Sequence, residues 1–171
     1  MLGLTSLGLV HTAISLVAVV AGAIALFRYR RIAWATLAGK VYIATTALTC
    51  ITGFGIFQHG GFGKPHALGI ITLVVLAAAL AADLKHWFGK AARYVAVVGY
   101  SATYLFNWIP GITETATRLP LGAPLVSSPE APELQVASGA LFIVFLVGAA
   151  LQVLQLRAHP AETLEDKLPS T

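Results

Sequence analysis

Charged residues and cysteine are scarce in this chain. Only 11% of its 171 residues are Asp, Glu, Lys or Arg, whereas 57% are hydrophobic, and the mean hydropathy is +0.81. A water-soluble domain alternates apolar and polar positions, but here the charges stand between long apolar runs. The single cysteine, Cys50, excludes an internal disulfide and does not indicate a redox compartment. The composition therefore indicates a protein that lies in a lipid bilayer.

Motifs of several large enzyme classes are also missing. The chain has no Gly-x-Ser-x-Gly, Walker loop, Cys-x-x-Cys or His-Glu-x-x-His. Its net charge of +4 comes from cations in the predicted loops, without an aromatic-interleaved basic patch, so we expect no nucleic-acid partner. The first apolar run lacks a basic start and a small-residue cleavage site, and we interpret it as a retained span and not as a signal peptide.

Five apolar segments are long enough to cross the roughly 30 Å hydrocarbon core as helices. They predict an all-α integral membrane fold, a bundle of five transmembrane helices over residues 7–27, 41–57, 66–82, 94–113 and 136–156. Pro110 and Gly111 predict a kink or an early end in the fourth helix. A rival four-span model breaks that helix at Pro110 and places Glu130 and Glu133 inside. In the five-span model, residues 114–135 form an extramembrane loop.

Lysine and arginine predict the orientation. Nine of the eleven fall on one side of the predicted spans, and only Lys64 and Arg118 fall on the other. Because cytoplasmic loops are enriched in Lys and Arg, we expect the N-terminus outside and the C-terminus inside, with residues 157–171 as a polar cytoplasmic tail. The expected location is the inner membrane of a bacterial cell, as a multi-pass protein in contact with the lipid bilayer. The nine cations are Arg28, Arg30, Arg31, Lys40, Lys85, Lys90, Arg93, Arg157 and Lys167.

Polar residues recur at helical spacing inside four of the spans, which places them on faces turned into the bundle. The stripe of the fourth span consists of Tyr100, Tyr104, Asn107, Gly111 and Glu114. The stripe of the second span consists of Tyr42, Thr45, Thr49, Thr52 and His59. The first span offers His11, Ser15 and Gly22, and the third offers His66, Gly69 and Thr72. All four stripes reach the outer face, where we predict a polar pocket.

The predicted pocket is a cofactor-binding site on several helices. Its residues are His11, His59, His66, Tyr104, Asn107 and Glu114, and His11 and His66 are also the candidate metal ligands. Imidazoles ligate the iron of haem b or a divalent metal, and a carboxylate can support them. Alternatively, these histidines bond to headgroups or loop carbonyls at the interface, and the threonines bond to their own backbone. We identify no catalytic residue, and the pattern favours a binding protein over an enzyme.

Several short motifs also stand in a characteristic order. They are His11 in the first span, Gly39-Lys40-Val41-Tyr42 at the start of the second, a glycine-containing turn before His66, and Tyr100 through Arg118-Leu119-Pro120. Together, over about residues 8–120, they resemble a family of predicted multi-pass bacterial membrane proteins of unknown function. The resemblance implies the multi-pass fold and carries over no activity. That family has a His-Arg pair where this chain has Ala35 and Thr36, so no site with a cytoplasmic histidine there is expected.

The leading functional hypothesis is a membrane protein that binds a haem, a metal or a small molecule in the outer-facing pocket, as an accessory component of a redox or envelope system. The first rival is a structural subunit of a larger membrane complex, in which case partner subunits are expected. The second is a small transporter or lipid-handling protein that works through Glu114 and Arg118, although this i,i+4 pair is typical of a structural ion pair. Asp83 and Glu114 both fall near span ends, which disfavours a proton-coupled transporter.

Overall fold

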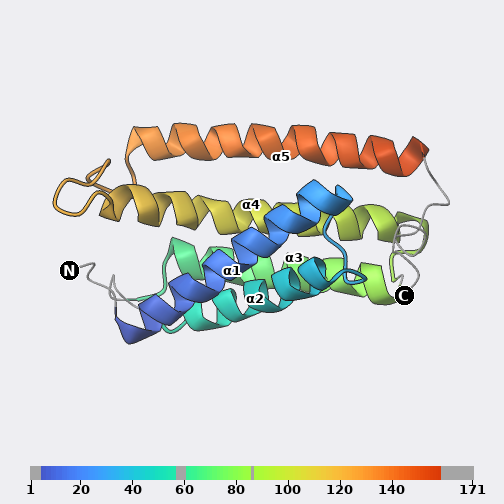
Figure 1. Ribbon diagram of the computed structural model, residues 1–171, viewed down its shortest axis with the longest axis horizontal. Coiled ribbons are helices and arrows are strands. Elements are labelled where there is room, and N and C mark those ends of the chain that lie inside the picture. The colour runs from blue at the N-terminus through green and yellow to red at the C-terminus, as the bar shows by residue number, and fades with distance from the viewer. Residues whose placement is uncertain (1–4, 57–60, 86, 159–171) are drawn as a thin grey trace.

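The computed structural model describes residues 5–56, 61–85 and 87–158, and within these ranges all regular structure is helical. The five α-helices are α1 (Ser6–Tyr29), α2 (Leu37–Gly53), α3 (Lys64–Lys85), α4 (Ala92–Arg118) and α5 (Pro132–Ala158), with a short 3-10 helix η1 (Gly89–Ala91) before α4. They form an elongated bundle in which successive helices alternate in direction (Figure 1). His59 and most of the expected polar tail, residues 159–171, lie outside the described residues.

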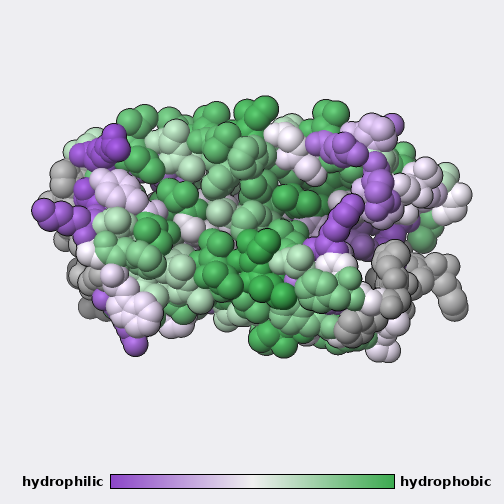
Figure 2. All heavy atoms as spheres, turned by 180° about the vertical axis from the view of Figure 1, so that it is seen from behind, coloured by the Kyte–Doolittle hydropathy of each residue, from purple (hydrophilic) through white to green (hydrophobic). Residues whose placement is uncertain are grey.

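The two ends of the bundle carry different connections. The N-terminal end holds the start of α1, the α2–α3 connection and the α4–α5 loop (Figure 1). The C-terminal end holds the α1–α2 and α3–α4 connections and the end of α5. The space-filling view shows hydrophobic residues over the middle and hydrophilic residues gathered at both ends (Figure 2). This distribution is the one that a bilayer favours, because its core cannot hydrate polar groups.

Three of the described helices, α1, α3 and α5, are long and apolar enough to cross a membrane, judged by length and composition. The 17 residues of α2 extend about 25 Å at 1.5 Å per residue. The 27 residues of α4 include polar and charged side chains along much of the helix. The helix α2 is therefore shorter than the three span-capable helices, and α4 is more polar than they are.

A side-chain cap determines where α2 begins. The Thr36 hydroxyl oxygen accepts a hydrogen bond from the Gly39 N–H at 3.0 Å, which satisfies a backbone donor of the first turn. The helix therefore starts at Leu37, earlier than the expected residue 41. Lys40 lies in the first turn, where its side chain is exposed and its ammonium group lies 5.8 Å from the centroid of the Trp34 ring. An exposed lysine at a helix end avoids the desolvation expected at mid-bilayer.

The fourth helix does not end at Pro110. It continues to Arg118, so the expectation of an early end is wrong. Proline lacks an N–H and removes one bond of the helical ladder, but the helix resumes at once, and the Thr113 hydroxyl donates to the Ile109 carbonyl at 2.9 Å. The extension places Glu114 inside the helix and shortens the expected loop over residues 114–135 to residues 119–131.

The helix α4 lies at the centre of the packing. It packs against α1, α3 and α5, while α2 packs against α1 and α3. Small residues allow close approach: a Cβ added at Gly99 of α4 would lie 2.9 Å from Ala79 Cβ of α3. This arrangement brings together the inner faces of α1, α2 and α4, whereas α1 and α3 are not among the closely packed pairs of the described residues.

Candidate functional site

The interior of the bundle holds a hydrogen-bonded cluster from α2 and α4. The Tyr42 hydroxyl lies 2.8 Å from Thr103 Oγ1, and Asn107 Nδ2 donates to Thr46 Oγ1 at 3.2 Å and to the Thr103 carbonyl at 3.3 Å. Tyr42, Thr46 and Thr103 have no exposed surface. We refer to these four residues as the central network. Asn107, expected to contact a cofactor, thus uses its amide donor inside the bundle.

Tyr104, also expected at the cofactor site, contacts α1. Its hydroxyl donates to the Val19 carbonyl at 3.2 Å. Its ring lies over Gly22, where an added Cβ would be 2.5 Å from Tyr104 Cε2. On the other side, its ring meets that of Trp108 edge to face, with centroids 6.3 Å apart. These contacts position α1 against α4.

His11 is half-buried near the N-terminal end, against α2. Its Nδ1 lies 3.1 Å from Thr52 Oγ1, and an added Cβ at Gly53 would meet His11 Cε1 at 3.2 Å. The Thr52 hydroxyl also lies 2.8 Å from the Leu48 carbonyl, which can only accept, so the hydroxyl proton is directed there. This arrangement favours the tautomer in which Nδ1 donates to Thr52 and Nε2 keeps its lone pair, as in histidines that ligate metals through Nε2.

Glu114 lies at the same end of the bundle, on the last turns of α4. Its Oε2 accepts a hydrogen bond from Arg118 Nε at 2.5 Å, which forms the i,i+4 ion pair that the sequence indicates. The Glu114 carboxylate is also within electrostatic range of the His11 imidazole. The structure therefore brings two of the predicted site residues, His11 and Glu114, into one region.

His66 makes a separate set of contacts. It is buried in the first turn of α3, with its ring centroid 5.4 Å from that of Phe62. Its Nδ1 accepts a hydrogen bond from the Gly63 N–H at 3.3 Å. An Nδ1 that accepts a hydrogen bond leaves the proton of a neutral imidazole on Nε2. The protonated Nε2 has no lone pair with which to ligate a metal. The two candidate metal ligands therefore differ in the nitrogen that carries the proton, which is Nδ1 in His11 and Nε2 in His66.

The described residues do not form a protein-built metal centre. Within residues 5–56, 61–85 and 87–158, no three His, Cys, Asp or Glu side chains lie together in a way that could hold a metal ion. The expected haem or divalent-metal site is thus without support from a ligand cluster in this part of the chain. One imidazole, that of His11, keeps a lone pair on Nε2 and fits a single contact to a ligand.

Asp83 directly follows the third predicted span, residues 66–82, and the structure includes it in α3. The carboxylate oxygen Oδ2 accepts hydrogen bonds from the Trp34 N–H at 2.8 Å and from the Tyr100 hydroxyl at 3.4 Å. Asp83 thereby joins the α1–α2 connection, α3 and α4 at the C-terminal end. A carboxylate directly after an apolar run indicates such a role, because the charged group needs hydrogen-bond partners if the helix continues past it.

Gln152 of α5 is a second residue that the sequence stripes did not include. Its Oε1 accepts from the Ser101 hydroxyl at 2.8 Å, and its Nε2 donates to the Arg30 carbonyl at 3.0 Å. One buried amide thus connects α5 to α4 and to the end of α1. The sequence signal was a glutamine inside an apolar run, which is costly in a membrane unless it has partners.

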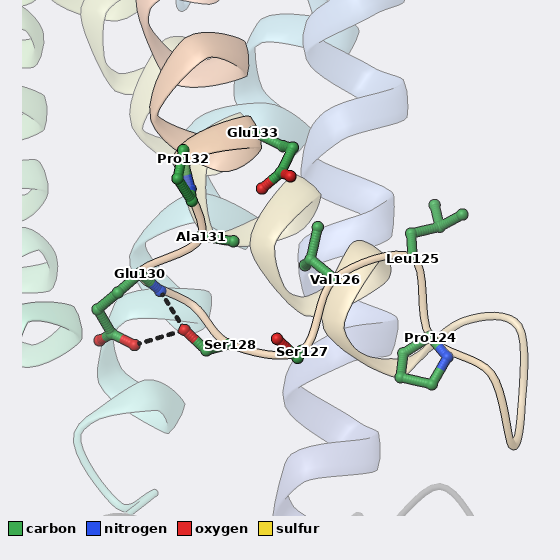
Figure 3. Close-up of a pocket in the computed structure, with 9 residues that line it drawn as sticks. All are labelled: Pro124, Leu125, Val126, Ser127, Ser128, Glu130, Ala131, Pro132 and Glu133. Carbon is green, nitrogen blue, oxygen red and sulfur yellow. Dashed lines mark hydrogen bonds between the residues drawn. The ribbon is translucent and has the colours of Figure 1, made fainter.

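A cavity of about 590 Å³ lies where the α4–α5 loop meets the start of α5 (Figure 3). Two of the polar residues that line it bond to each other: Ser128 Oγ accepts from the Glu130 N–H at 3.1 Å and donates to the Glu130 carboxylate at 3.2 Å. A single stretch of chain, residues 124–133, supplies its lining residues. The cavity is therefore the concave side of a folded loop, separate from the contacts of His11.

Comparisons of the chain with protein-family models, with curated proteins and with solved structures find no match. The resemblance to a multi-pass bacterial family therefore stays a prediction, and the function has to be argued from the geometry.

Proposed function

We propose that the protein crosses the bacterial inner membrane five times, with its N-terminus outside and its C-terminus in the cytoplasm. Support comes from the alternating helix directions and from the three span-capable helices. The polarity of α4 is compatible with a span, because Asn107 and Thr103 bond within the bundle and leave more apolar side chains to the lipid. Most of the described cations lie at the C-terminal end of the bundle, which becomes the cytoplasmic end.

In this topology the protein binds a small ligand at the outer end of the bundle, with His11 as the principal contact. The observation that carries the proposal is the direction of the Thr52 hydrogen bonds, which leaves His11 Nε2 as an acceptor. A histidine with only a structural role needs no such available nitrogen. The half-buried position of His11 limits competition from water while leaving part of the residue accessible.

The chemistry of the contact limits the classes of ligand that can bind. His11 Nε2 suits a molecule that donates a hydrogen bond, or a metal-centred cofactor that brings its other ligands with it. The neighbouring Glu114 and Arg118 form an ion pair without net charge, so the region does not select strongly for an anion. A divalent metal held by several protein side chains is not the form proposed, because the described residues lack the cluster that it needs.

The test is a search for bound ligand in protein purified from cells supplied with iron and haem. A visible absorption spectrum, metal analysis and mass spectrometry of the denatured extract should reveal one stoichiometric ligand. We expect the ligand to be lost in His11→Ala and retained in His66→Ala, which serves as the matched control. A ligand that survives His11→Ala, or wild-type protein without any ligand, contradicts the proposal.

The central network favours a second candidate function, a structural subunit of a larger membrane complex. The Asn107 amide N–H donates to Thr46 and the Tyr42 hydroxyl bonds with Thr103, as expected of side chains that hold a scaffold together. Under this proposal, a complex of fixed composition should survive extraction in mild detergent, and its mass on native electrophoresis should be unchanged by His11→Ala. A monodisperse, ligand-bearing monomer excludes this candidate.

A further inference from the structure

The helices α1 and α2 meet along two rows of residues with identical spacings. The row on α1 is His11, Ser15, Ala18 and Gly22, and the row on α2 is Tyr42, Thr46, Thr49 and Gly53. Contacts are seen at both ends of the rows. An added Cβ at Gly53 would lie 3.2 Å from His11 Cε1, and an added Cβ at Gly22 would lie 3.0 Å from Tyr42 Cδ2.

These two contacts define the register between the rows. The helices run in opposite directions, and both rows follow a spacing of 4, 3 and 4 residues. Positions between the two end contacts therefore meet in order, because i+3 and i+4 neighbours share one helix face. Ser15 of α1 is thereby placed opposite Thr49 of α2, one turn inside the contact of His11 with Gly53.

Thr49 differs from the other threonines of α2. The hydroxyls of Thr45 and Thr52 donate to the carbonyl four residues earlier, at 2.7 and 2.8 Å, and that of Thr46 accepts from Asn107. Thr49 is only 9% exposed, yet its Oγ1 meets no hydrogen-bond partner among the described residues. A buried hydroxyl without a partner is costly, so the position calls for a hydrogen-bonding group that is not part of these residues.

Ser15 supplies the complementary side. Its hydroxyl donates to the Thr12 carbonyl at 2.9 Å, which leaves its oxygen as an acceptor. No direct hydrogen bond joins Ser15 to Thr49, although both residues are described. A molecule between them has to donate to Ser15, and it can either donate to or accept from Thr49. Water has both capacities, and no charged side chain belongs to either row that would favour an ion.

We propose that half-buried Ser15 and buried Thr49 form a binding position for a water molecule between α1 and α2. It lies one turn inside His11 and one turn from Thr46 of the central network. The water therefore extends the polar interior from the central network towards His11. This inference goes beyond the proposed ligand site, because the water binds whether or not a ligand contacts His11.

The first measurement is the thermal midpoint of the purified protein in detergent. Thr49→Val removes a partner of the water at nearly constant side-chain volume, and we expect the midpoint to fall by about 2 to 4 °C. Thr45→Val is the matched control, because its hydroxyl bonds only its own helix, and it should fall by less. If Thr49 truly lacks a partner, Thr49→Val relieves a buried polar group and raises the midpoint. A raised or unchanged midpoint overturns the proposal.

The second measurement detects the water directly. In protein with 13C-labelled threonine methyl groups, we expect magnetisation transfer from water to the Thr49 methyl, identified by its loss in Thr49→Val. Thr46 controls for exchange of hydroxyl protons, because it is fully buried and bonds directly to Asn107. Transfer at Thr49 that weakens in Ser15→Ala supports the bridge. Absence of transfer at Thr49, transfer at Thr49 that is unchanged in Ser15→Ala, or equal transfer at Thr46 overturns the proposal even if the midpoint falls.

Discussion

The Asp83 carboxylate accepts the backbone N–H of Trp34 at 2.8 Å, a contact between residues 49 positions apart in the chain. Trp34 lies in the connection between α1 and α2, where no helical ladder satisfies its N–H. The same carboxylate oxygen accepts from the Tyr100 hydroxyl, so one side chain of α3 holds a backbone turn and a buried tyrosine of α4. One carboxylate oxygen of Asp83 therefore joins the α1–α2 connection, α3 and α4 at the C-terminal end of the bundle.

This relationship predicts unequal effects of two substitutions at Asp83. Asp83→Ala leaves the Trp34 N–H and the Tyr100 hydroxyl without their acceptor and should lower the free energy of unfolding by about 1 to 3 kcal/mol. Asp83→Asn retains a carbonyl oxygen and should lower it by less than half as much. The measurement is denaturant unfolding in detergent. Glu114→Ala, at an exposed ion pair, controls for loss of a carboxylate and should cost under about 1 kcal/mol. Equal losses for Asp83→Ala and Asp83→Asn would contradict this role.

The positions of the helices could be anticipated because apolar runs of sufficient length have few alternatives to helix in lipid. The ends could not, because local chemistry determines them. The Thr36 cap starts α2 before Lys40, and α4 continues past Pro110. Sequence patterns predict a helix end to within a few residues. They do not show whether a helix that contains a proline ends there or continues past it.

The sequence predicts part of the arrangement of the candidate residues. Helical spacing predicts that Asn107 faces the interior of the bundle, and in the structure its side chain bonds to Thr46 of α2. Spacing cannot tell which helices are neighbours, however, and the pairing of His11 with His66 required α1 and α3 to be adjacent. The packed pairs are instead α1 with α2 and with α4. Because α1 packs against α2, His11 contacts Thr52, and because α1 packs against α4, Glu114 lies within electrostatic range of His11.

A second prediction concerns the glycine at the α1–α4 contact. In Gly22→Ala, the new Cβ would lie 2.5 Å from Tyr104 Cε2 and 3.0 Å from Tyr42 Cδ2. Both rings are held by hydrogen bonds of their hydroxyls and cannot withdraw freely. We expect a loss of about 1 to 3 kcal/mol in unfolding free energy.

The matched control for this glycine is Gly148→Ala in α5, where an added Cβ meets nothing within 4 Å. Alanine has the higher helix propensity, so this substitution should raise the unfolding free energy by about 0.5 to 1 kcal/mol. The two changes add the same methyl group and should act with opposite signs. A loss of stability at Gly148, or a gain at Gly22, would show that the close contact is misplaced.

A third prediction follows from the buried amide of α5. Gln152→Leu removes the partner of the Ser101 hydroxyl and of the Arg30 carbonyl, and should lower the unfolding free energy by about 0.6 to 2 kcal/mol. Gln155→Leu, at an exposed position one turn later, is the control and should have little effect or stabilise the helix in lipid. Protease protection of α5 in detergent gives an independent readout. Similar behaviour of the two variants would mean that Gln152 does not hold α5.

A fourth prediction rests on the backbone of Arg30. This residue ends α1 with φ 61° and ψ 4°, in the left-handed region that favours glycine. Arg30→Gly keeps the carbonyl that Gln152 uses and should raise the unfolding free energy by about 1 kcal/mol. Arg28→Gly, inside the helix, should lower it by about 1 kcal/mol. Both variants lose one cation at the same end of the bundle, but Arg28→Gly also removes the contact of Arg28 with the Tyr29 ring, so the two variants are compared by the sign of their effect. Destabilisation by Arg30→Gly would contradict the left-handed conformation.

The last prediction tests the proposed orientation, on which the outer position of His11 depends. In a Cys50→Ala background, Ser127→Cys in the α4–α5 loop should react with an impermeant maleimide on intact cells, because five spans place that loop outside. Lys90→Cys, between α3 and α4, should react only after the membrane is permeabilised, and a reporter fused after Thr171 should be active only in the cytoplasm. The four-span alternative places the loop with Glu130 inside, so it protects Ser127→Cys on intact cells. If Lys90→Cys alone reacts from outside, the bundle is inverted. His11 then faces the cytoplasm, and the ligand has to be sought among cytoplasmic molecules.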